Sequence, residues 1–249
     1  MQGERGSEML TREAEGLRAL AATDEIHIPR VIGLTRSGYG AALILEYIER
    51  QPPKPDSMTR LGRRLAHMHG HRATRFGWET NNFIGRLDQI NTREADWAVF
   101  YGRHRLAYQM RLAVRNGLMS AGEVPAEENL IAHLRMHLPA HIGPALLHGD
   151  LWSGNYLFGP GGTPFLIDPA VYYGHAEVDL AMTRLFGGFD KSFYAAYREV
   201  RPCDGDENYL TDIYQLYYLL VHLNLFGSSY YSSVRRIMDR YFGRSAGKL

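Results

Sequence analysis

The amino-acid sequence predicts an α+β fold with two lobes, a small amino-terminal lobe over residues 1–50 and a mainly helical lobe over residues 51–249. Two short apolar segments typical of strands stand near the amino end, and most of the later sequence has apolar residues at helical spacing. Between them lies RQPPKPDS, residues 50–57, whose prolines and polar residues are typical of a linker. A cleft between two lobes is a common place for a ligand, so we expect the functional site there.

The small lobe is expected to contain one helix and one hairpin. The helix is predicted over residues 8–22 by apolar residues at helical spacing, namely Leu10, Ala14, Leu17 and Ala21. Glu13 stands on this apolar stripe, where a carboxylate needs a partner unless it lies at the edge of the stripe. Residues 28–34 and 41–48 are short and apolar, and the turn residues TRSGYG between them predict two strands of a hairpin.

The larger lobe is expected to be helical except for one hairpin. Ser57 can cap the helix that follows the linker. Apolar spacing then predicts helices over residues 94–116, 125–138, 176–186, 206–227 and 229–242. Before the third of these, NYLF (155–158) and PFLID (164–168) flank GPGGT, which predicts a glycine-rich hairpin.

The composition is that of a soluble globular protein. Of the 249 residues, 45% are hydrophobic and 22% are charged, and the formal net charge is +1, so charge indicates neither a nucleic-acid nor a membrane partner. The one cysteine, Cys203, excludes an intramolecular disulfide and favours a reducing compartment. The longest apolar run, from Leu216, is too short to span a bilayer, and residues 1–10 have no apolar signal-peptide core. We therefore expect a cytoplasmic protein.

The segment LLHGDLWSGNYLF, residues 146–158, places polar side chains among apolar ones at a spacing that indicates chemistry. His148, Asp150 and Asn155 match the kinase catalytic loop H-R-D-L-x-x-x-N except at the arginine, and Asp168 follows the hairpin where a metal-binding Asp would stand. In phosphoryl transfer an Asp accepts the proton of the attacking hydroxyl, while an Asn and a second Asp hold Mg²⁺. The alternative is a buried His–Asp pair and a turn residue, but several matches in register favour the catalytic interpretation.

Other polar residues near this loop have two interpretations each. Asp179 opens a helix and is expected to be structural, either through the helix dipole or by bracing the catalytic loop with backbone hydrogen bonds. Trp152 could be a platform for a sugar ring or a buried core residue. His222 and Asn224 could line the acceptor pocket, although a hydrogen-bonded core histidine is the simpler account of His222. His67, His69 and His71 alternate, but on a helix only His67 and His71 share a face, so these histidines are expected at a solvated helix end rather than in a metal site.

Several segments together resemble the fructosamine kinase family, also called ketosamine-3-kinases. They are HGDLWSGN, FLIDPAVYYGHAEVDLAM, RFGWETNNFIG (75–85), RHRLAYQMRLA (103–113) and QLYYLLVHLNLFGSSY near the end. The pattern HGDLxxGN is shared with aminoglycoside phosphotransferases and with choline or homoserine kinases, so it is only moderately specific. Trp152, the block at 75–85 and the tail favour the narrower family, and the resemblance runs from about residue 10 to the end.

The resemblance implies a protein-kinase-like fold that binds ATP between its lobes. It implies transfer of the γ-phosphoryl group to the sugar 3-hydroxyl of a ketosamine, such as a fructosyl- or ribulosyl-lysine of a metabolite or a protein, after which the adduct breaks down and frees the amine. At the matching positions, Asp150 would be the general base, and Asn155 and Asp168 would hold magnesium. The backbone of residues 46–48 would bind adenine and Glu13 would pair with the lysine that anchors ATP. The three hinge residues are Glu46, Tyr47 and Ile48.

The amino end departs from the family pattern. Family members begin with further strands that carry a glycine-rich loop and the ATP-binding lysine, whereas no lysine precedes Lys54 here, so we expect a truncated small lobe. Either the natural protein is longer, or the chain is a non-catalytic relative that binds a sugar-amine or a protein. The intact Asp150, Asn155 and Asp168 favour the first explanation. A phosphotransferase of the aminoglycoside or choline type is a further alternative, but its cationic acceptors would need more acidic clusters than the one at residues 123–129.

Overall fold

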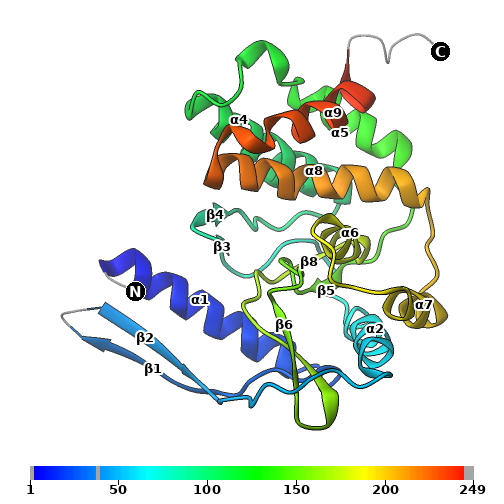
Figure 1. Ribbon diagram of the computed structural model, residues 1–249. Coiled ribbons are helices and arrows are strands. Elements are labelled where there is room, and N and C mark those ends of the chain that lie inside the picture. Colours follow the sequence, from blue (N-terminus) through cyan, green and yellow to red (C-terminus); the bar gives the residue numbers. More distant parts are fainter. Residues whose placement is uncertain (1–2, 38–39, 244–249) are drawn as a thin grey trace.

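The amino-terminal part of the chain forms one long helix and one hairpin. In the computed structural model, which describes residues 3–37 and 40–243, helix α1 spans Gly3–Ala21, followed by strands β1 (Val31–Ser37) and β2 (Gly40–Leu45). The two strands pair antiparallel, and the helix and hairpin lie together at one side of the molecule (Figure 1). The predicted helix and hairpin are confirmed, although the helix begins earlier than expected; residues 38–39, where the turn was expected, lie outside the described residues.

The remainder of the chain is mainly helical. Its helices are α2 (Ser57–Met68), α3 (Trp97–Tyr101), α4 (Tyr108–Arg115), α5 (Glu127–His137), α6 (Glu177–Leu185), α7 (Lys191–Val200), α8 (Glu207–Phe226) and α9 (Tyr231–Phe242), with short helical turns η2 (Ala121–Glu123), η3 (Pro160–Gly162) and η4 (Ser228–Tyr230). The predicted helices over 125–138, 176–186, 206–227 and 229–242 are confirmed within a few residues. Helix α7 was not predicted, although its buried Phe193, Ala196 and Tyr197 have helical spacing.

The helix predicted over residues 94–116 contains a π-helical segment, η1 (Gly102–Ala107), between α3 and α4. Arg105 in this segment is fully buried. Its guanidinium donates hydrogen bonds to the backbone oxygen of Ile90 (2.5 Å) and to Asn91 Oδ1 (2.8 Å), and it lies 4.0 Å from the centre of the Tyr172 ring. Carbonyl oxygens and an aromatic face therefore stabilise this buried cation.

Six short strands form three antiparallel pairs near the centre of the molecule. Strand β3 (Asn82–Ile84) pairs with β4 (Leu87–Gln89), β5 (Ala145–Leu147) with β8 (Tyr172–Gly174), and β6 (Tyr156–Gly159) with β7 (Thr163–Leu166). The β6–β7 pair confirms the predicted glycine-rich hairpin. The other two pairs were not predicted, because strands of three residues are too short for a recognisable alternation. In the described part of the chain no helix is long and apolar enough to cross a membrane.

Helix α2 packs closely against α7. A Cβ atom at Gly62 would lie 2.1 Å from the backbone oxygen of Phe193, so the absence of a side chain permits this approach. Ser57 does not cap α2, contrary to expectation, because it lies inside the first turn and no side chain caps the preceding Asp56 position. Instead its hydroxyl donates to the backbone oxygen of Gly162 (2.6 Å), which joins the linker to the β6–β7 hairpin.

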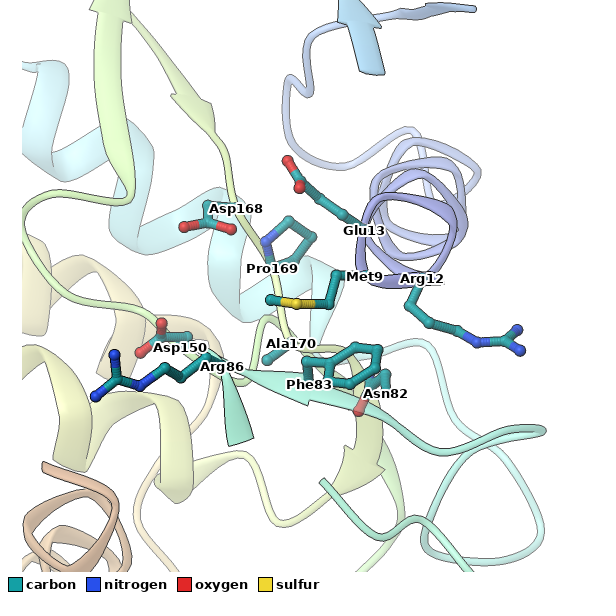
Figure 2. Close-up of a pocket in the computed structure, with 11 residues that line it drawn as sticks. Met9, Arg12, Glu13, Asn82, Phe83, Arg86, Asp150, Asp168, Pro169 and Ala170 are labelled. Carbon is teal, nitrogen blue, oxygen red and sulfur yellow. The ribbon is translucent and has the colours of Figure 1, made fainter. Parts of the chain in front are cut away.

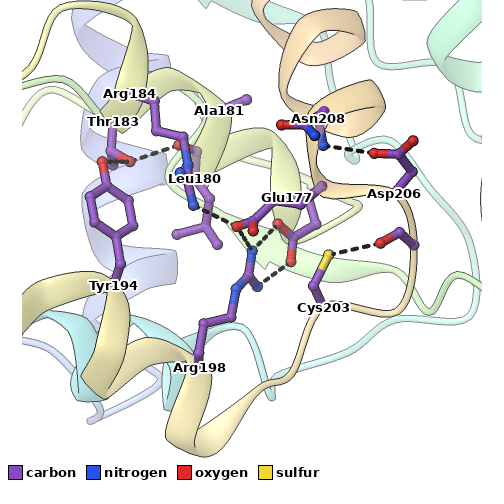
Figure 3. A network of polar contacts seen from close by, with 12 residues as sticks. Glu177, Leu180, Ala181, Thr183, Arg184, Tyr194, Arg198, Cys203, Asp206 and Asn208 are labelled. Atoms are coloured by element: carbon purple, nitrogen blue, oxygen red, sulfur yellow. Dashed lines mark hydrogen bonds and ion pairs between the residues drawn. The ribbon is translucent and has the colours of Figure 1, made fainter. Parts of the chain in front are cut away.

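A network of ion pairs joins α6, α7 and α8 (Figure 3). Glu177 at the start of α6 is only 7% exposed and accepts two hydrogen bonds from Arg198, at 2.6 and 2.7 Å. Arg198 also reaches Glu207 on α8 at 2.9 Å, and Arg184 reaches the same carboxylate at 2.6 Å. Because bidentate arginine–carboxylate pairs fix geometry as well as charge, this network sets the position of the first turn of α6.

We predict that Glu177→Gln lowers the free energy of unfolding by about 2 kcal/mol, because it removes the charge that balances the partly buried Arg198. Urea denaturation followed by circular dichroism measures this. The control is Glu199→Gln on α7, which breaks an exposed pair with Arg63 of α2 and should change stability by less than about 0.5 kcal/mol. Equal losses in the two variants would contradict the assigned role of Glu177.

Candidate active site

A cavity of about 250 Å³ opens between α1, the β3–β4 hairpin and the segment that follows β7. Three carboxylates, from Glu13, Asp150 and Asp168, take part in its lining. Figure 2 shows them arranged around the cavity, with Glu13 coming from α1 and Asp168 lying between it and Asp150. Residues far apart in the sequence therefore converge on one space, as the catalytic-loop spacing predicts for Asp150 and Asp168.

Asn155 joins the two aspartates through its side chain. Its Nδ2 donates to the backbone oxygen of Asp150 (2.8 Å) and is 3.4 Å from Asp150 Oδ2 and 3.3 Å from the backbone oxygen of Asp168. The backbone N–H of Ile167 donates to the backbone oxygen of Asn155 at 3.0 Å. The structure thus brings together Asp150, Asn155 and Asp168, with the amide nitrogen of Asn155 directed toward the backbone of both aspartates.

The backbone of the catalytic loop is held by Asp179, which is fully buried in the first turn of α6. Its two carboxylate oxygens accept the backbone N–H groups of His148 (2.8 Å) and Gly149 (2.9 Å). Burial alone would raise the pKa of Asp179, but the hydrogen bond and charge of His69, together with these donors, hold that pKa below its ordinary value. The predicted bracing of the loop by Asp179 is therefore confirmed.

His69 is a residue that sequence reasoning misplaced. It is fully buried, with Nε2 at 3.1 Å from Asp179 Oδ2 and Nδ1 at 2.8 Å from the hydroxyl of Tyr197 on α7. The expectation of a solvated helix end is confirmed for His67 and His71, which are exposed, but was wrong for His69, because residue 69 continues the inner face that Leu61 and Leu65 define at four-residue spacing. That spacing was the signal that could have identified it.

His148 links the catalytic loop to the strand segment before Asp168. Its Nε2 lies 2.9 Å from the backbone oxygen of Ile167, while the backbone N–H of Asp150 donates to its Nδ1 at 3.3 Å. Burial lowers the pKa of His148. A neutral imidazole that donates at Nε2 and accepts at Nδ1 satisfies both contacts, so His148 has a structural role and holds Asp150 and Asp168 in register.

The segment around Asp168 is fixed from its other side by buried amides of the β3–β4 hairpin. Asp168 has a φ angle of +53°, a conformation that non-glycine residues rarely adopt outside functional sites. Gln89 donates to the backbone oxygen of Ala170 (3.0 Å) and Asn82 to that of Val171 (2.8 Å). Sequence reasoning missed these two supports, although the block at 75–85 that contains Asn82 had been singled out.

The electrostatics of the cavity favour a cation. Burial raises the pKa of Asp150 to about 7, and the charges of Asp168 and Asp179 contribute. Burial likewise raises the pKa of Glu13 to about 7, with a contribution from Asp168. No lysine, arginine or histidine of the described chain forms an ion pair with Glu13 or Asp150. Buried carboxylates whose pKa is raised by burial and by a neighbouring negative charge are stabilised by a positive ligand.

The oxygen groups present fit a magnesium ion. Mg²⁺ prefers oxygen ligands and is usually bound by one or two carboxylates together with substrate phosphates and water. The carboxylate of Asp168, which lines the cavity, and the amide of Asn155, which is hydrogen-bonded to the backbone of Asp168, are oxygen ligands of this kind. Within residues 3–37 and 40–243 no group of three or more His, Cys, Asp or Glu side chains is placed to hold a metal ion.

The remaining predicted site residues lie outside the cavity lining. Trp152 is 40% exposed and its indole covers Gly154, so the alternative of a buried core tryptophan is wrong. His222 donates from Nδ1 to the backbone oxygen of Tyr218 (2.8 Å) and contacts the ring of Phe186. Asn224 donates to Gln109. Their roles at an acceptor pocket stay predictions.

The predicted adenine-binding residues follow β2. The backbone N–H of Glu46 donates to the backbone oxygen of Arg30 (2.8 Å), and its carboxylate accepts the N–H of Arg30 (3.1 Å). The side chain of Tyr47 is 87% exposed. Ile48 lies against Gly159 of β6. This places the segment at the side of the β6–β7 hairpin, and adenine binding by Glu46, Tyr47 and Ile48 stays a prediction.

Comparisons with known proteins give one consistent result. A family model described as fructosamine kinase matches residues 1–244. A probable ketoamine kinase from Synechocystis is 40% identical over 94% of this chain and 78% of its own length. The chloroplastic protein-ribulosamine 3-kinase of Arabidopsis thaliana is 40% identical over 95% of this chain and 73% of its own length. A crystal structure from Thermobifida fusca, provisionally named a fructosamine-3-kinase, superposes with a TM-score of 0.84 at 32% identity, covering 95% and 80% of the two chains. The predicted protein-kinase-like fold is confirmed.

We predict that Asp150→Asn stabilises the protein at alkaline pH. The pKa of Asp150 is about 7 in the folded chain and near its ordinary 3.8 in the unfolded chain, so the folded state holds the proton more tightly. The stability that this group contributes is fully present below the unfolded pKa and is lost as the pH rises through about 7. The variant should therefore exceed the parent by about 2 kcal/mol at pH 8 and by little at pH 4.

Urea denaturation of both proteins across this pH range, without nucleotide or magnesium, is the measurement. The matched control is Asp56→Asn at an exposed position before α2, which should follow the parent at every pH. A difference between the Asp150 variant and the parent that does not grow with pH would contradict the raised pKa.

Proposed function

The chain belongs to the fructosamine kinase family, and from that membership we propose that it transfers the γ-phosphoryl group of ATP to the sugar 3-hydroxyl of ketosamines. Relatives named ketoamine kinase and protein-ribulosamine 3-kinase are 40% identical over more than nine-tenths of the chain, so it is a phosphotransferase with a hydroxyl acceptor on glycated amines. The phosphorylated adduct then breaks down and frees the amine, which makes the reaction a step of deglycation.

The observation that carries the proposed mechanism is the convergence of Asp150 and Asp168 at one cavity, with the side chain of Asn155 hydrogen-bonded to the backbone of both. We assign Asp150 as the general base that accepts the proton of the attacking hydroxyl. The hydroxyl oxygen forms a bond to the γ-phosphorus while the bond to the bridging oxygen of ADP breaks. A base with a pKa near 7 suits this task at neutral pH, because it is available as a carboxylate and still holds a proton well.

We assign Asn155 and Asp168 as the residues that hold magnesium, which when bound neutralises charge on the nucleotide phosphates. The raised pKa of Glu13 supports its assignment as the partner of a cation beside those phosphates. The backbone of residues 46–48 is proposed to bind adenine. Trp152, with its exposed indole, is proposed to contact the acceptor sugar, and His222 and Asn224 to lie near the acceptor. The single cysteine, Cys203, supports a cytoplasmic location.

We predict that Asp150→Asn lowers kcat for phosphorylation of a ribulosyl- or fructosyl-amine by about 10²–10⁴-fold, because the amide cannot accept the hydroxyl proton. The full chain is incubated with ATP, magnesium chloride and the ketosamine, and ADP release and ³¹P NMR of the sugar phosphate are followed. Asp168→Asn should raise the magnesium concentration needed for half-maximal rate, whereas Asp56→Asn at an exposed site should match the parent.

Equal rates for the parent and the Asp150 variant would refute the assignment of the base. If neither protein transfers phosphate to any ketosamine, while both bind it in calorimetry, the chain is a sugar-amine binding relative rather than an active kinase.

A further inference from the structure

Arg86 holds a fixed position at the cavity, in the turn between β3 and β4. The turn is confined on two sides. Gly85 has a φ of +55° and faces the side chain of Leu225 on α8. On the other side Arg5 of α1 donates to the backbone oxygen of Arg86 at 3.0 Å. The Arg86 guanidinium itself donates one hydrogen bond from Nη2 to the backbone oxygen of Leu225, also at 3.0 Å.

Arg86 differs from the other arginine of the cavity lining in having no acidic partner. Arg12 pairs with Glu15 at 2.8 Å and is within 4.0 Å of Glu8, so its charge is balanced on α1. Among the described residues no carboxylate lies within 4.0 Å of the Arg86 guanidinium. The bond to Leu225 uses one of its five N–H donors, which leaves donors for a ligand.

The position of Arg86 in the cavity favours contact of its guanidinium with the acceptor rather than with the nucleotide. In Figure 2 its guanidinium lies on the side of Asp150, whereas Glu13 lies beyond Asp168 on the opposite side. Glu13 and Asp168 are assigned to the nucleotide and its metal, and Asp150 to the acceptor hydroxyl. A cation on the Asp150 side of the same cavity is therefore placed to meet the part of the acceptor that follows the reacting sugar.

We propose that Arg86 binds the carboxylate of the amine carrier, so that the preferred substrates are ketosamines of free amino acids. This inference rests on the proposed function. Three carboxylates line the cavity and would repel a negatively charged acceptor, and Arg86 offsets that repulsion with a planar group suited to bidentate carboxylate binding. A glycated lysine within a protein presents amides on either side of its α-carbon in place of a carboxylate, and so lacks this contact.

The test compares fructosyl-glycine with fructosyl-glycinamide, which differ in the carboxylate alone. For the parent chain we expect kcat/KM to be about tenfold or more higher for the acid, since charge-assisted hydrogen bonds discriminate by that order. Arg86→Gln should bring the ratio to about one by raising KM for the acid. Arg86→Lys should keep an intermediate ratio because it retains the charge without the planar fork. The control, Arg63→Gln on the outer face of α2, should keep the parental ratio.

Each other outcome overturns the inference. If the parent phosphorylates both acceptors with equal kcat/KM, the proposed carboxylate subsite is refuted, while the proposed function stands. A higher KM for ATP in the Arg86 variant, with an unchanged acid-to-amide ratio, would assign Arg86 to the nucleotide phosphates. Failure of the parent to phosphorylate either compound would defeat the proposed function, and the inference with it.

Discussion

The arrangement of the site depends on one buried carboxylate. Asp179 accepts two backbone N–H groups of the catalytic loop and a hydrogen bond from His69, so donors from two distant parts of the chain meet on one side chain. Without it, the N–H groups of His148 and Gly149 would be buried without acceptors, at a cost of about 1–3 kcal/mol each. The ion pairs of Glu177 fix the helix turn that carries Asp179, and through it they fix the loop.

Burial raises the pKa of each carboxylate near the site, and hydrogen-bond donors outweigh this effect at only one of them. Asp179 is the most deeply buried, yet its hydrogen-bond donors keep its pKa low and its charge permanent. Asp150 and Glu13 are less buried, but the carboxylate of Asp150 has only one long contact, from Asn155 Nδ2 at 3.4 Å, and no donor to Glu13 contributes to its pKa, so both pKa values rise to about 7. The number of donors, rather than the depth of burial, therefore separates the carboxylate that builds the site from those that are available for chemistry.

Most of the geometry of the candidate site could be predicted from local patterns in the sequence. The spacing of His148, Asp150 and Asn155 and the hairpin before Asp168 are short-range features, and the structure has them as expected. Contacts that depend on tertiary packing could not be predicted. Helical periodicity placed His69 at a helix end, but it did not reveal that the imidazole contacts the carboxylate of Asp179. Likewise nothing local indicated that a π-helical turn would direct Arg105 into the core, where it meets Asn91.

The close approach of α2 to α7 makes the loop sensitive to a position remote from the cavity. The backbone of Phe193 occupies the space that a methyl group at Gly62 would need. The same pair of helices also carries the hydrogen bond between His69 and Tyr197, which orients the imidazole toward Asp179. An alanine at position 62 would push α2 and α7 apart and turn the His69 imidazole away from Asp179. One added methyl group would then disturb the catalytic loop without any change in the residues that line the cavity.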